Sequence, residues 1–142
     1  MKLVKHLLDV KGSEVIAITR DASVFDAIKL MADRAVGSLL VMEDVTLLGI
    51  VTERDYARKV ILRGRSSETT AVGDIMTPDP ITAVPGQTVS ECMTLMTEKR
   101  IRHLPVAEGG RVIGLISIGD LVNAIISDQQ QEIEQLEQYI SG

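Results

Sequence analysis

Hydrophobic and polar positions follow two different periods along the chain. Short apolar runs such as VIAIT (15–19) and SLLVM (38–42) predict β-strands. Between these two runs, residues 24–35 carry apolar side chains three or four positions apart, which predicts an amphipathic helix with one buried face. After SLLVM comes a turn, EDVT, and then a second apolar run, LLGIV (47–51), so the sequence predicts a hairpin.

This order of elements is written a second time, 65 positions later. Residues 21–61 align with residues 86–126 without a gap, which is far more specific than any short motif. Nine of the 41 aligned positions are identical: Val24/Val89, Leu30/Leu95, Met31/Met96, Leu39/Leu104, Val41/Val106, Glu43/Glu108, Gly49/Gly114, Asp55/Asp120 and Ile61/Ile126. The sequence therefore predicts an α/β protein of the α+β type, in which two β-α-β-β-α units pack about a pseudo-two-fold axis, with terminal helices.

Helix starts are predicted at matching places in the two copies. Ser23 with Asp26, and Thr88 with Glu91, are hydroxyl and acidic residues three positions apart, as in a capping box. Each pair stands directly before a run with helical apolar spacing.

Candidate chemistry lies where the second strand of each hairpin runs into the next helix. LLGIVTERD (47–55) and VIGLISIGD (112–120) share a strand glycine, a hydroxyl residue and an aspartate. The first turn of a helix presents unpaired N–H groups that suit a phosphate, so Thr52 and Ser117 are candidate phosphate-binding residues. The carboxylates of Asp55 and Asp120 are hydrogen-bond acceptors suited to a ribose diol.

Two further features bear on this candidate nucleotide site. Gly49 and Gly114, inside strands, would let a flat group such as a base approach the backbone closely. Each hydroxyl and aspartate also fits a purely structural helix cap, in which the acid returns to the helix's own backbone. Both interpretations stay open for a single motif, whereas its exact repetition favours a ligand site.

Composition excludes several functional classes. A net charge of -5, a sequence pI near 5.0 and 2% aromatic residues argue against a nucleic-acid partner. No apolar run has the length of a membrane helix, and the first residues lack the pattern of a signal peptide, so no membrane partner and a cytoplasmic location are expected. The single cysteine, Cys92, allows no internal disulfide and is expected to be a buried core residue.

No motif supports catalysis or metal binding. The chain has no nucleophile elbow, no Walker-type phosphate loop and no paired acid and base groups beyond the two aspartates. His6 and His103 lack the spacing of metal ligands, so no catalytic residue, no metal site and no enzymatic activity are expected.

With both copies and both motifs, the chain resembles a tandem pair of cystathionine-β-synthase-type (CBS) domains, the Bateman module, and is similar to stand-alone bacterial signal-transduction proteins of this type. The resemblance implies a first CBS domain over residues 7–62, a linker over 63–71, a second CBS domain over 72–127, and an amphipathic C-terminal helix over 128–142.

The resemblance implies adenosyl ligands, AMP, ADP, ATP or NAD, bound in clefts between the two CBS domains. Asp55 and Asp120 would then bind ribose hydroxyls, and Thr52 and Ser117 would contact phosphate. The resemblance also implies phosphate contacts from the strand before each hairpin, which reads IRHLPV in the second copy and VGSLLV in the first.

The two sites are expected to be unequal, because the residues of these strands differ in charge. Arg102 and His103 are candidate phosphate-binding residues in the second copy, and Arg54 is a further candidate in the first. The remaining candidates are uncharged and would line the base and backbone pocket: Gly37, Ser38, Gly49, Gly114 and Pro105.

The resemblance implies a regulatory module that senses cellular energy or redox state by binding an adenine nucleotide and signals through a conformational change. A homodimer of CBS pairs and an unknown effector protein are its implied partners. Ile133, Leu136 and Ile140 form a narrow apolar stripe on the tail helix and are expected to dock on a partner. The alternative is a structural or dimerisation module whose clefts have no physiological ligand.

Overall fold

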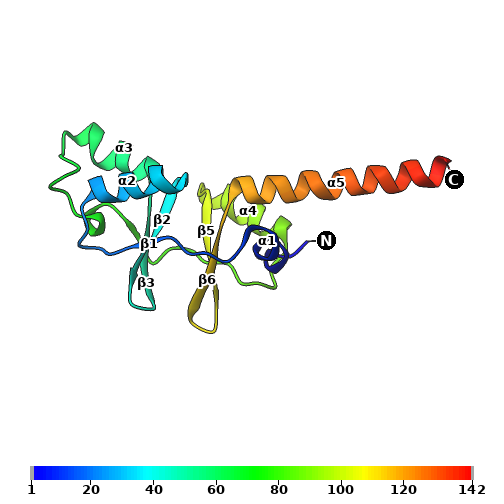
Figure 1. The fold of residues 1–142 in the computed structure, drawn as a ribbon, viewed down its shortest axis with the longest axis horizontal. Helices are drawn as coiled ribbons and strands as arrows, with labels where there is room; N and C mark the ends of the chain where they lie inside the picture. The colour runs from blue at the N-terminus through cyan, green and yellow to red at the C-terminus, as the bar shows by residue number, and fades with distance from the viewer. Residues whose placement is uncertain (1, 142) are drawn as a thin grey trace. The chain divides into compact units, whose positions relative to one another are not determined.

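Residues 2–141 are described by the computed structural model, in which the chain forms two compact units (Figure 1). The first-repeat unit is Val15–Ile81, and the second-repeat unit consists of residues 2–14 together with residues 82–141. Each unit has its own hydrophobic core. The mixed α/β class predicted from the sequence is confirmed.

The first-repeat unit contains a four-stranded sheet in the order β1-β2-β3-β4. Its elements are β1 (Ala17–Ile18), α2 (Val24–Arg34), β2 (Ser38–Glu43), β3 (Thr46–Thr52), α3 (Glu53–Lys59), the 3-10 helices η1 (Ile61–Arg63) and η2 (Val72–Asp74), and β4 (Thr77–Pro78). β2 and β3 form the predicted antiparallel hairpin, β1 runs parallel to β2, and β4 pairs antiparallel with β3. Helices α2 and α3 contact each other, and each contacts one strand of the hairpin.

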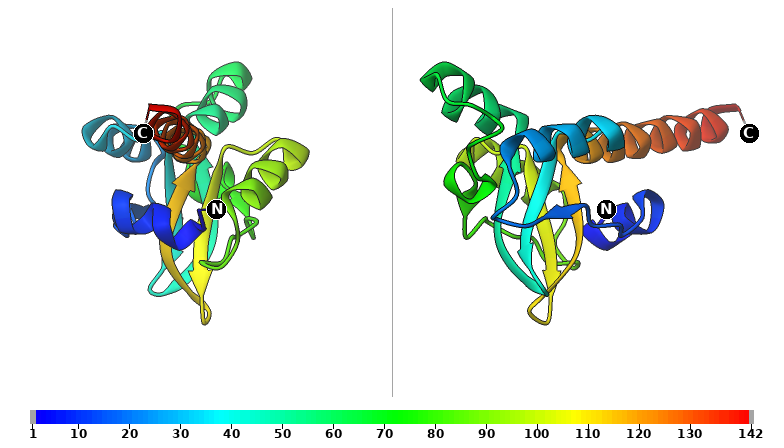
Figure 2. Two further views of the ribbon diagram at one scale, coloured as in Figure 1. Left: turned by 90° about the vertical axis from the view of Figure 1, so that its right-hand side faces the viewer. Right: turned by 60° about the vertical axis from the view of Figure 1, so that its left-hand side comes forward.

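The second-repeat unit is built around one hairpin and three helices. Its elements are α1 (Val4–Lys11), α4 (Val89–Lys99), β5 (His103–Glu108), β6 (Arg111–Ser117) and α5 (Ile118–Ser141). Helix α5 contacts α4, β6 and α1 (Figure 2). It is one continuous helix across the predicted boundary at residue 128.

The predicted helix starts before α2 and α4 are confirmed. Ser23 Oγ accepts a hydrogen bond from the backbone N–H of Asp26 at 3.1 Å, and Thr88 Oγ1 accepts one from Glu91 at 3.0 Å. These bonds satisfy N–H groups that have no partner within the helix itself.

The opening strand of the second repeat is shorter than that of the first, because a proline stands in its neighbour. In the first repeat, the N–H of Leu40 donates to the carbonyl of Ile16 at 3.1 Å. Pro105 occupies the corresponding position of β5 and has no N–H to donate. Only one bridge, between Ala83 and Val106, stands where the first repeat has the parallel pair of β1 and β2.

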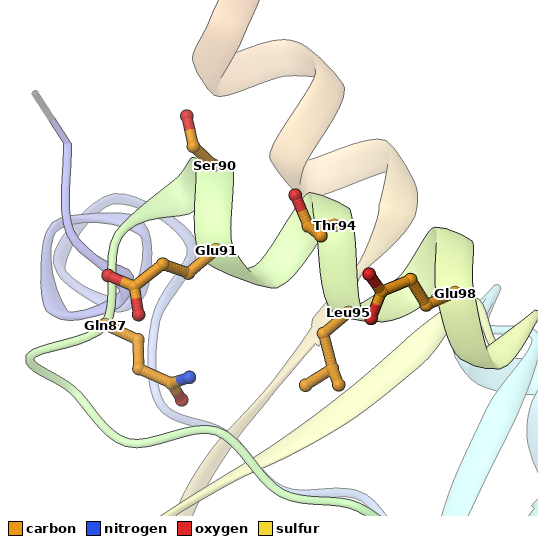
Figure 3. A pocket seen from close by; sticks show the side chains of 6 residues that line it. All are labelled: Gln87, Ser90, Glu91, Thr94, Leu95 and Glu98. Atoms are coloured by element: carbon orange, nitrogen blue, oxygen red, sulfur yellow. The ribbon is translucent and has the colours of Figure 1, made fainter.

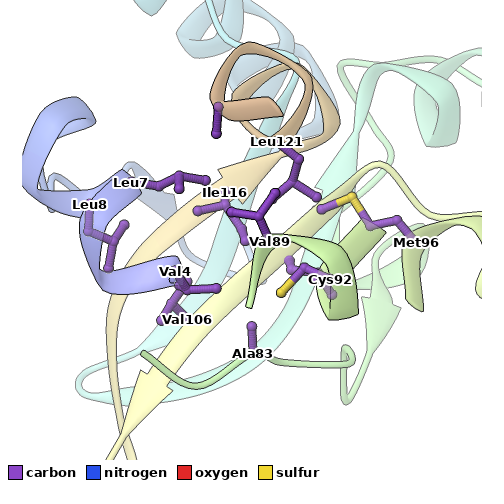
Figure 4. Packing of buried hydrophobic residues seen from close by; sticks show 12 residues of the cluster. Val4, Leu7, Leu8, Ala83, Val89, Cys92, Met96, Val106, Ile116 and Leu121 are labelled. Carbon is purple, nitrogen blue, oxygen red and sulfur yellow. The ribbon is translucent and has the colours of Figure 1, made fainter. Parts of the chain in front are cut away.

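The N-terminal segment completes the core of the second-repeat unit. The N–H groups of Val4 and Lys5 donate to the carbonyls of Gln87 and Pro85. Val4, Leu7 and Leu8 are buried in the same cluster as residues of α4, β5, β6 and α5 (Figure 4). The compact units therefore do not follow the sequence repeats, because residues 2–14 precede the first repeat and pack with the second.

Among residues 2–141, none of the helices combines the length and the apolar character that crossing a membrane requires.

Candidate functional site

The junction of β3 and α3 holds Thr52 and Asp55 in a reciprocal cap. The N–H of Asp55 donates to Thr52 Oγ1 at 3.1 Å, while the N–H of Thr52 donates to Asp55 Oδ2 at 2.9 Å. The Thr52 hydroxyl also donates to Asp55 Oδ2, at 3.1 Å. The carboxylate is thereby fixed at the end of the strand, with 14% of its side chain exposed.

A lysine of the same helix neutralises Asp55. Lys59 Nζ lies 3.2 Å from Asp55 Oδ1 and donates to the carbonyl of Ile75 at 2.8 Å. Both carboxylate oxygens of Asp55 are therefore engaged within the first-repeat unit. We call Thr52, Asp55 and Lys59 the first corner.

The junction of β6 and α5 repeats this cap with Ser117 and Asp120. The N–H of Asp120 donates to Ser117 Oγ at 3.2 Å, and the N–H of Ser117 donates to Asp120 Oδ2 at 2.8 Å. Asp120 is more open than Asp55, with 26% of its side chain exposed. The N–H of Ser117 and Lys11 Nζ both donate to Oδ2 of Asp120.

A lysine from a different element neutralises Asp120. Lys11 Nζ, at the end of α1, lies 2.6 Å from Asp120 Oδ2 and donates to the carbonyl of Leu115 at 2.6 Å. Burial raises the pKa of Asp120, but the hydrogen bonds from Lys11 and Ser117 outweigh burial, so the pKa lies below its ordinary value. We call Ser117, Asp120 and Lys11 the second corner.

Arg102 and His103 lie beside the second corner. The carbonyl of Arg102 accepts from the N–H of Ile118 at 2.9 Å, and His103 pairs with Ser117 across the hairpin. Burial lowers the pKa of His103, the positive charges of Lys11 and Arg102 lower it further, and Asp120 opposes them. Arg102 is exposed.

The matching residues beside the first corner are uncharged. The carbonyl of Gly37 accepts from the N–H of Glu53 at 3.1 Å, and the buried Ser38 pairs with Thr52. Arg54 is exposed in the first turn of α3. The difference in charge between the two strands predicted from the sequence is therefore retained around the two corners.

The strand glycines, where the sequence predicts close approach of a ligand base, face the chain's own atoms instead. A Cβ at Gly49 would lie 2.7 Å from both Met76 Sδ and the carbonyl oxygen of Thr77. A Cβ at Gly114 would lie 2.6 Å from Leu8 Cδ2. Packing within each unit is thus sufficient to require glycine at both positions.

Pro105, the remaining predicted pocket residue, is buried in β5, and its carbonyl accepts from the N–H of Ala83 at 2.8 Å. The pairing of β5 with the segment around Ala83, which opens the second repeat, explains the position of Pro105.

A separate hollow of about 430 Å³ lies on the outer face of α4 (Figure 3). Its lining residues are Gln87, Ser90, Glu91, Thr94, Leu95 and Glu98. The two glutamates disfavour an anionic ligand, and the hollow contains no residue of either corner. Within residues 2–141, His, Cys, Asp and Glu side chains form no group of three that could hold a metal ion.

Comparison with known proteins identifies the family. The sequence profile of the CBS domain matches residues 8–62 and residues 72–127. The chain belongs to the CBS domain family. The second CBS match includes the second corner's Ser117 and Asp120, and the first includes Thr52 and Asp55.

Relatives of this CBS pair occur in plants and bacteria. The mitochondrial CBS domain-containing protein CBSX3 of Arabidopsis thaliana is 47% identical over 129 residues, which cover 87% of this chain and 63% of the relative. The chain thus spans less than two thirds of that protein. A solved structure of a protein with CBS domains from Burkholderia ambifaria MC40-6, for which a role in signal transduction has been suggested, is 51% identical, with a TM-score of 0.87, covering 90% of this chain and 96% of that one.

A third similar structure contains ligands. The CBS domain pair of protein MJ0100, solved in complex with 5'-methylthioadenosine and S-adenosyl-L-methionine, is 25% identical to this CBS pair with a TM-score of 0.80. The matched region covers 90% of this chain and 98% of the MJ0100 pair. Adenosyl ligands are therefore bound by a CBS pair of this fold.

Sequence reasoning missed the two lysines. Lys59 stands four positions after Asp55, a spacing at which side chains of a helix meet, so the sequence contained a signal for it. Lys11 lies 109 positions from Asp120, and no pattern in the sequence links them.

Proposed function

We propose that the chain is a regulatory module that binds an adenosyl ligand, with AMP, ADP, ATP and NAD as the adenine nucleotides of first choice. The observation that carries this proposal is the presence of two corners in which a strand ends at a capped helix and holds an aspartate in a fixed orientation. A carboxylate held in this way is oriented as an acceptor for a ribose diol, which would share the carboxylate with the paired lysine or displace it.

We expect the second corner to bind more tightly than the first. The side chain of Asp120 is more exposed than that of Asp55, and Arg102, His103 and Lys11 place cationic or hydrogen-bonding groups near it. A phosphate-bearing ligand gains from charge-assisted hydrogen bonds there. The first corner has a more enclosed carboxylate and the uncharged Gly37 and Ser38 beside it.

The ligand-bound MJ0100 pair supports the adenosyl class, since its ligands share the adenosine group with the nucleotides proposed here. We also propose that the chain acts as a homodimer and passes the ligand signal to an effector protein. No catalytic role is proposed.

Ligand binding tests the proposal. We expect AMP, ADP, ATP, NAD or S-adenosylmethionine to raise the melting temperature of the protein, because a ligand that binds only the folded state adds about 2.7 kcal/mol at 100 times its Kd. Asp120→Asn keeps the size of the side chain and a cap acceptor but removes the charge. By calorimetric titration it should weaken binding at least about tenfold, because hydrogen bonds to charged groups contribute about 1.5–3 kcal/mol.

Glu91→Gln is the matched control. Glu91 accepts from the N–H of Thr88 in the capping box of α4, so the variant alters a helix cap in the same unit without touching either corner. Its ligand affinity should equal that of the wild type. Equal weakening by Glu91→Gln and Asp120→Asn would assign the effect to helix capping and reject the ribose role of Asp120.

A structural module without a physiological ligand is the second candidate function. It is favoured by the observation that the caps, the lysines and the glycine contacts give every residue of the two corners a role within its own unit. This function is supported if none of the five compounds shifts the melting temperature and none copurifies with the protein, as measured by mass spectrometry after denaturation.

A further inference from the structure

The C-terminal part of α5 carries large apolar side chains that nothing in its unit covers. Leu121 and Ala124 are the buried residues of this helix, and Lys2 holds it near residue 128 through a hydrogen bond to Ser127 and an ion pair with Asp128. Beyond that point, residues 129–141 are all exposed. The helix extends past the rest of the second-repeat unit over a length of about 20 Å, at 1.5 Å per residue (Figure 1).

The exposed apolar residues of α5 follow a seven-residue repeat. Ile126, Ile133 and Ile140 occupy one heptad position, a, and Val122, Gln129 and Leu136 occupy the second seam position, d. Ile133 is 54% exposed, Leu136 is 62% exposed and Ile140 is 82% exposed. Apolar residues that recur at a and d in this way form the seam of a coiled coil.

The helix needs a partner on physical grounds. A segment of about 13 residues is marginal as an isolated helix in water, and helices in proteins owe most of their stability to packing of an apolar face. Covering the three seam residues Ile133, Leu136 and Ile140 would remove apolar surface from water.

The charges of the segment decide the orientation of a pair. Residues 129–141 contain Glu132, Glu134 and Glu137 and no lysine or arginine. In a parallel pair, Glu132 at position g would face Glu137 at position e of the other helix, and by symmetry this repulsion would occur twice. An antiparallel pair places g beside g and e beside e, which allows Glu132 to lie next to Tyr139 and Glu137 next to Gln130.

We infer that residues 129–140 of α5 form an antiparallel coiled coil with the same helix of a second copy of the chain. This inference rests on the proposed homodimer and names its contact surface. The occupant is a second copy because the stripe is self-complementary: in this register Ile133 at a of each helix packs against Leu136 at d of the other, and Ile140 lies beside Gln129.

The mass of the full chain in solution tests the surface. By sedimentation equilibrium, we expect the wild type to form a dimer, and Leu136→Glu to weaken dimerisation at least about 100-fold, because it places a charge in the apolar seam. Gln138→Glu is the control, since it adds the same charge at position f, away from the seam, and should leave the dimer constant unchanged. The exposure of Leu136 means that folding is retained, which helical content by circular dichroism will show.

Distances between spin labels test the orientation. In a Cys92→Ala background, labels at Glu134→Cys and Ser141→Cys share heptad position b. An antiparallel pair predicts a longer distance between the two copies at residue 141 than at residue 134, because the separation along the helix axis is about 20 Å greater at residue 141, at 1.5 Å per residue. Equal distances would overturn the antiparallel arrangement.

Other outcomes separate this inference from the proposed function. A dimer that persists unchanged in Leu136→Glu overturns the α5 surface and leaves the homodimer standing. A monomeric wild type at millimolar concentration overturns both the coiled coil and the homodimer. Adenosyl ligand binding is measured separately and is expected to be the same in Leu136→Glu as in the wild type.

Discussion

The two corners have the same kind of helix cap and differ in the lysine that neutralises the aspartate. In the first-repeat unit, Lys59 comes from the same helix as Asp55. In the second-repeat unit, alanine stands at the corresponding position, Ala124, and Lys11 arrives from α1 instead. In both units the lysine also donates to a backbone carbonyl, that of Ile75 or of Leu115.

The two repeats therefore share the geometry of the helix cap, while the lysine that pairs with the aspartate comes from a different element in each. The cap at Asp55 is a local feature of one helix. The cap at Asp120 ties the N-terminal helix to the junction of β6 and α5, so any group that competes for Asp120 also competes with Lys11 of α1.

The largest expected difference between the two units is in the loss of stability when a strand glycine is replaced by alanine. Gly49→Ala would place a methyl group 2.7 Å from the carbonyl oxygen of Thr77, which cannot move without its strand. Gly114→Ala meets the end of the Leu8 side chain, which can rotate. We expect a loss in the free energy of unfolding of about 3 kcal/mol for Gly49→Ala and about 1 kcal/mol for Gly114→Ala, measured by urea denaturation, since overpacking costs about 1–3 kcal/mol.

Gly86→Ala is the control for this pair, because no atom lies within 4 Å of the added methyl group. It should change the free energy of unfolding by less than about 0.5 kcal/mol. A larger loss at Gly114 than at Gly49 would contradict the distinction between backbone and side-chain contacts.

Replacing the two lysines is expected to have smaller effects on stability, and the two variants should differ in their effects on Asp120 and α1. Lys11→Met and Lys59→Met should each lower the free energy of unfolding by about 0.5 kcal/mol, because both ion pairs are partly exposed. Only Lys11→Met should raise the pKa of Asp120, as followed by NMR titration, and only it should speed amide hydrogen exchange in α1. Lys5→Met, at an exposed position of α1, is the control. If Lys59→Met speeds exchange in α1 to the same degree, the tether assigned to Lys11 is wrong.

The smallest expected effect is a pH dependence of the free energy of unfolding, which arises from His103 in the second-repeat unit. The pKa of His103 in the folded protein lies below its ordinary value of 6.5, so the unfolded chain binds a proton more readily. The contribution of His103 to stability is therefore complete above pH 6.5 and is lost as the pH falls toward its pKa in the folded protein. Urea denaturation between pH 7.5 and 5 should show this loss.

His103→Ser installs the residue of the first repeat, Ser38, and should flatten this pH dependence. The contribution of Asp120 is separable, because its pKa is lowered from an ordinary value of 3.8 and its stabilisation is lost only below that pH. An unchanged slope in His103→Ser would assign the dependence to other groups.

Much of the fold was predictable because it depends on local pattern. The hairpins follow from apolar runs separated by turns, and the starts of α2 and α4 follow from Ser23 and Thr88, which satisfy N–H groups within three residues. The aspartates at the two junctions were also predictable, since Thr52 and Asp55 bond to each other over the same short separation.

Other features could not be predicted, because they depend on contacts between residues far apart in the chain. Gly49 and Gly114 both stand between apolar residues in the sequence, yet Gly49 faces a backbone carbonyl and the Met76 side chain, whereas Gly114 faces the side chain of Leu8. The shortened opening strand of the second repeat depends on Pro105, whose missing N–H matters only because Ala83 lies beside it.

The sequence by itself determined the repeated hairpins, the capped helices, the placing of an aspartate at each strand end and the apolar stripe of the tail, since each is set by the spacing of nearby residues. Only the tertiary structure decided that residues 2–14 complete the second-repeat unit and that Lys11, rather than a residue of α5, meets Asp120. The physical reason is that both features depend on contacts between residues far apart in the chain. Val4, Leu7 and Leu8 are buried against residues of the second repeat, and the charge of Lys11 pairs with a distant aspartate, so the spacing of nearby residues predicts neither.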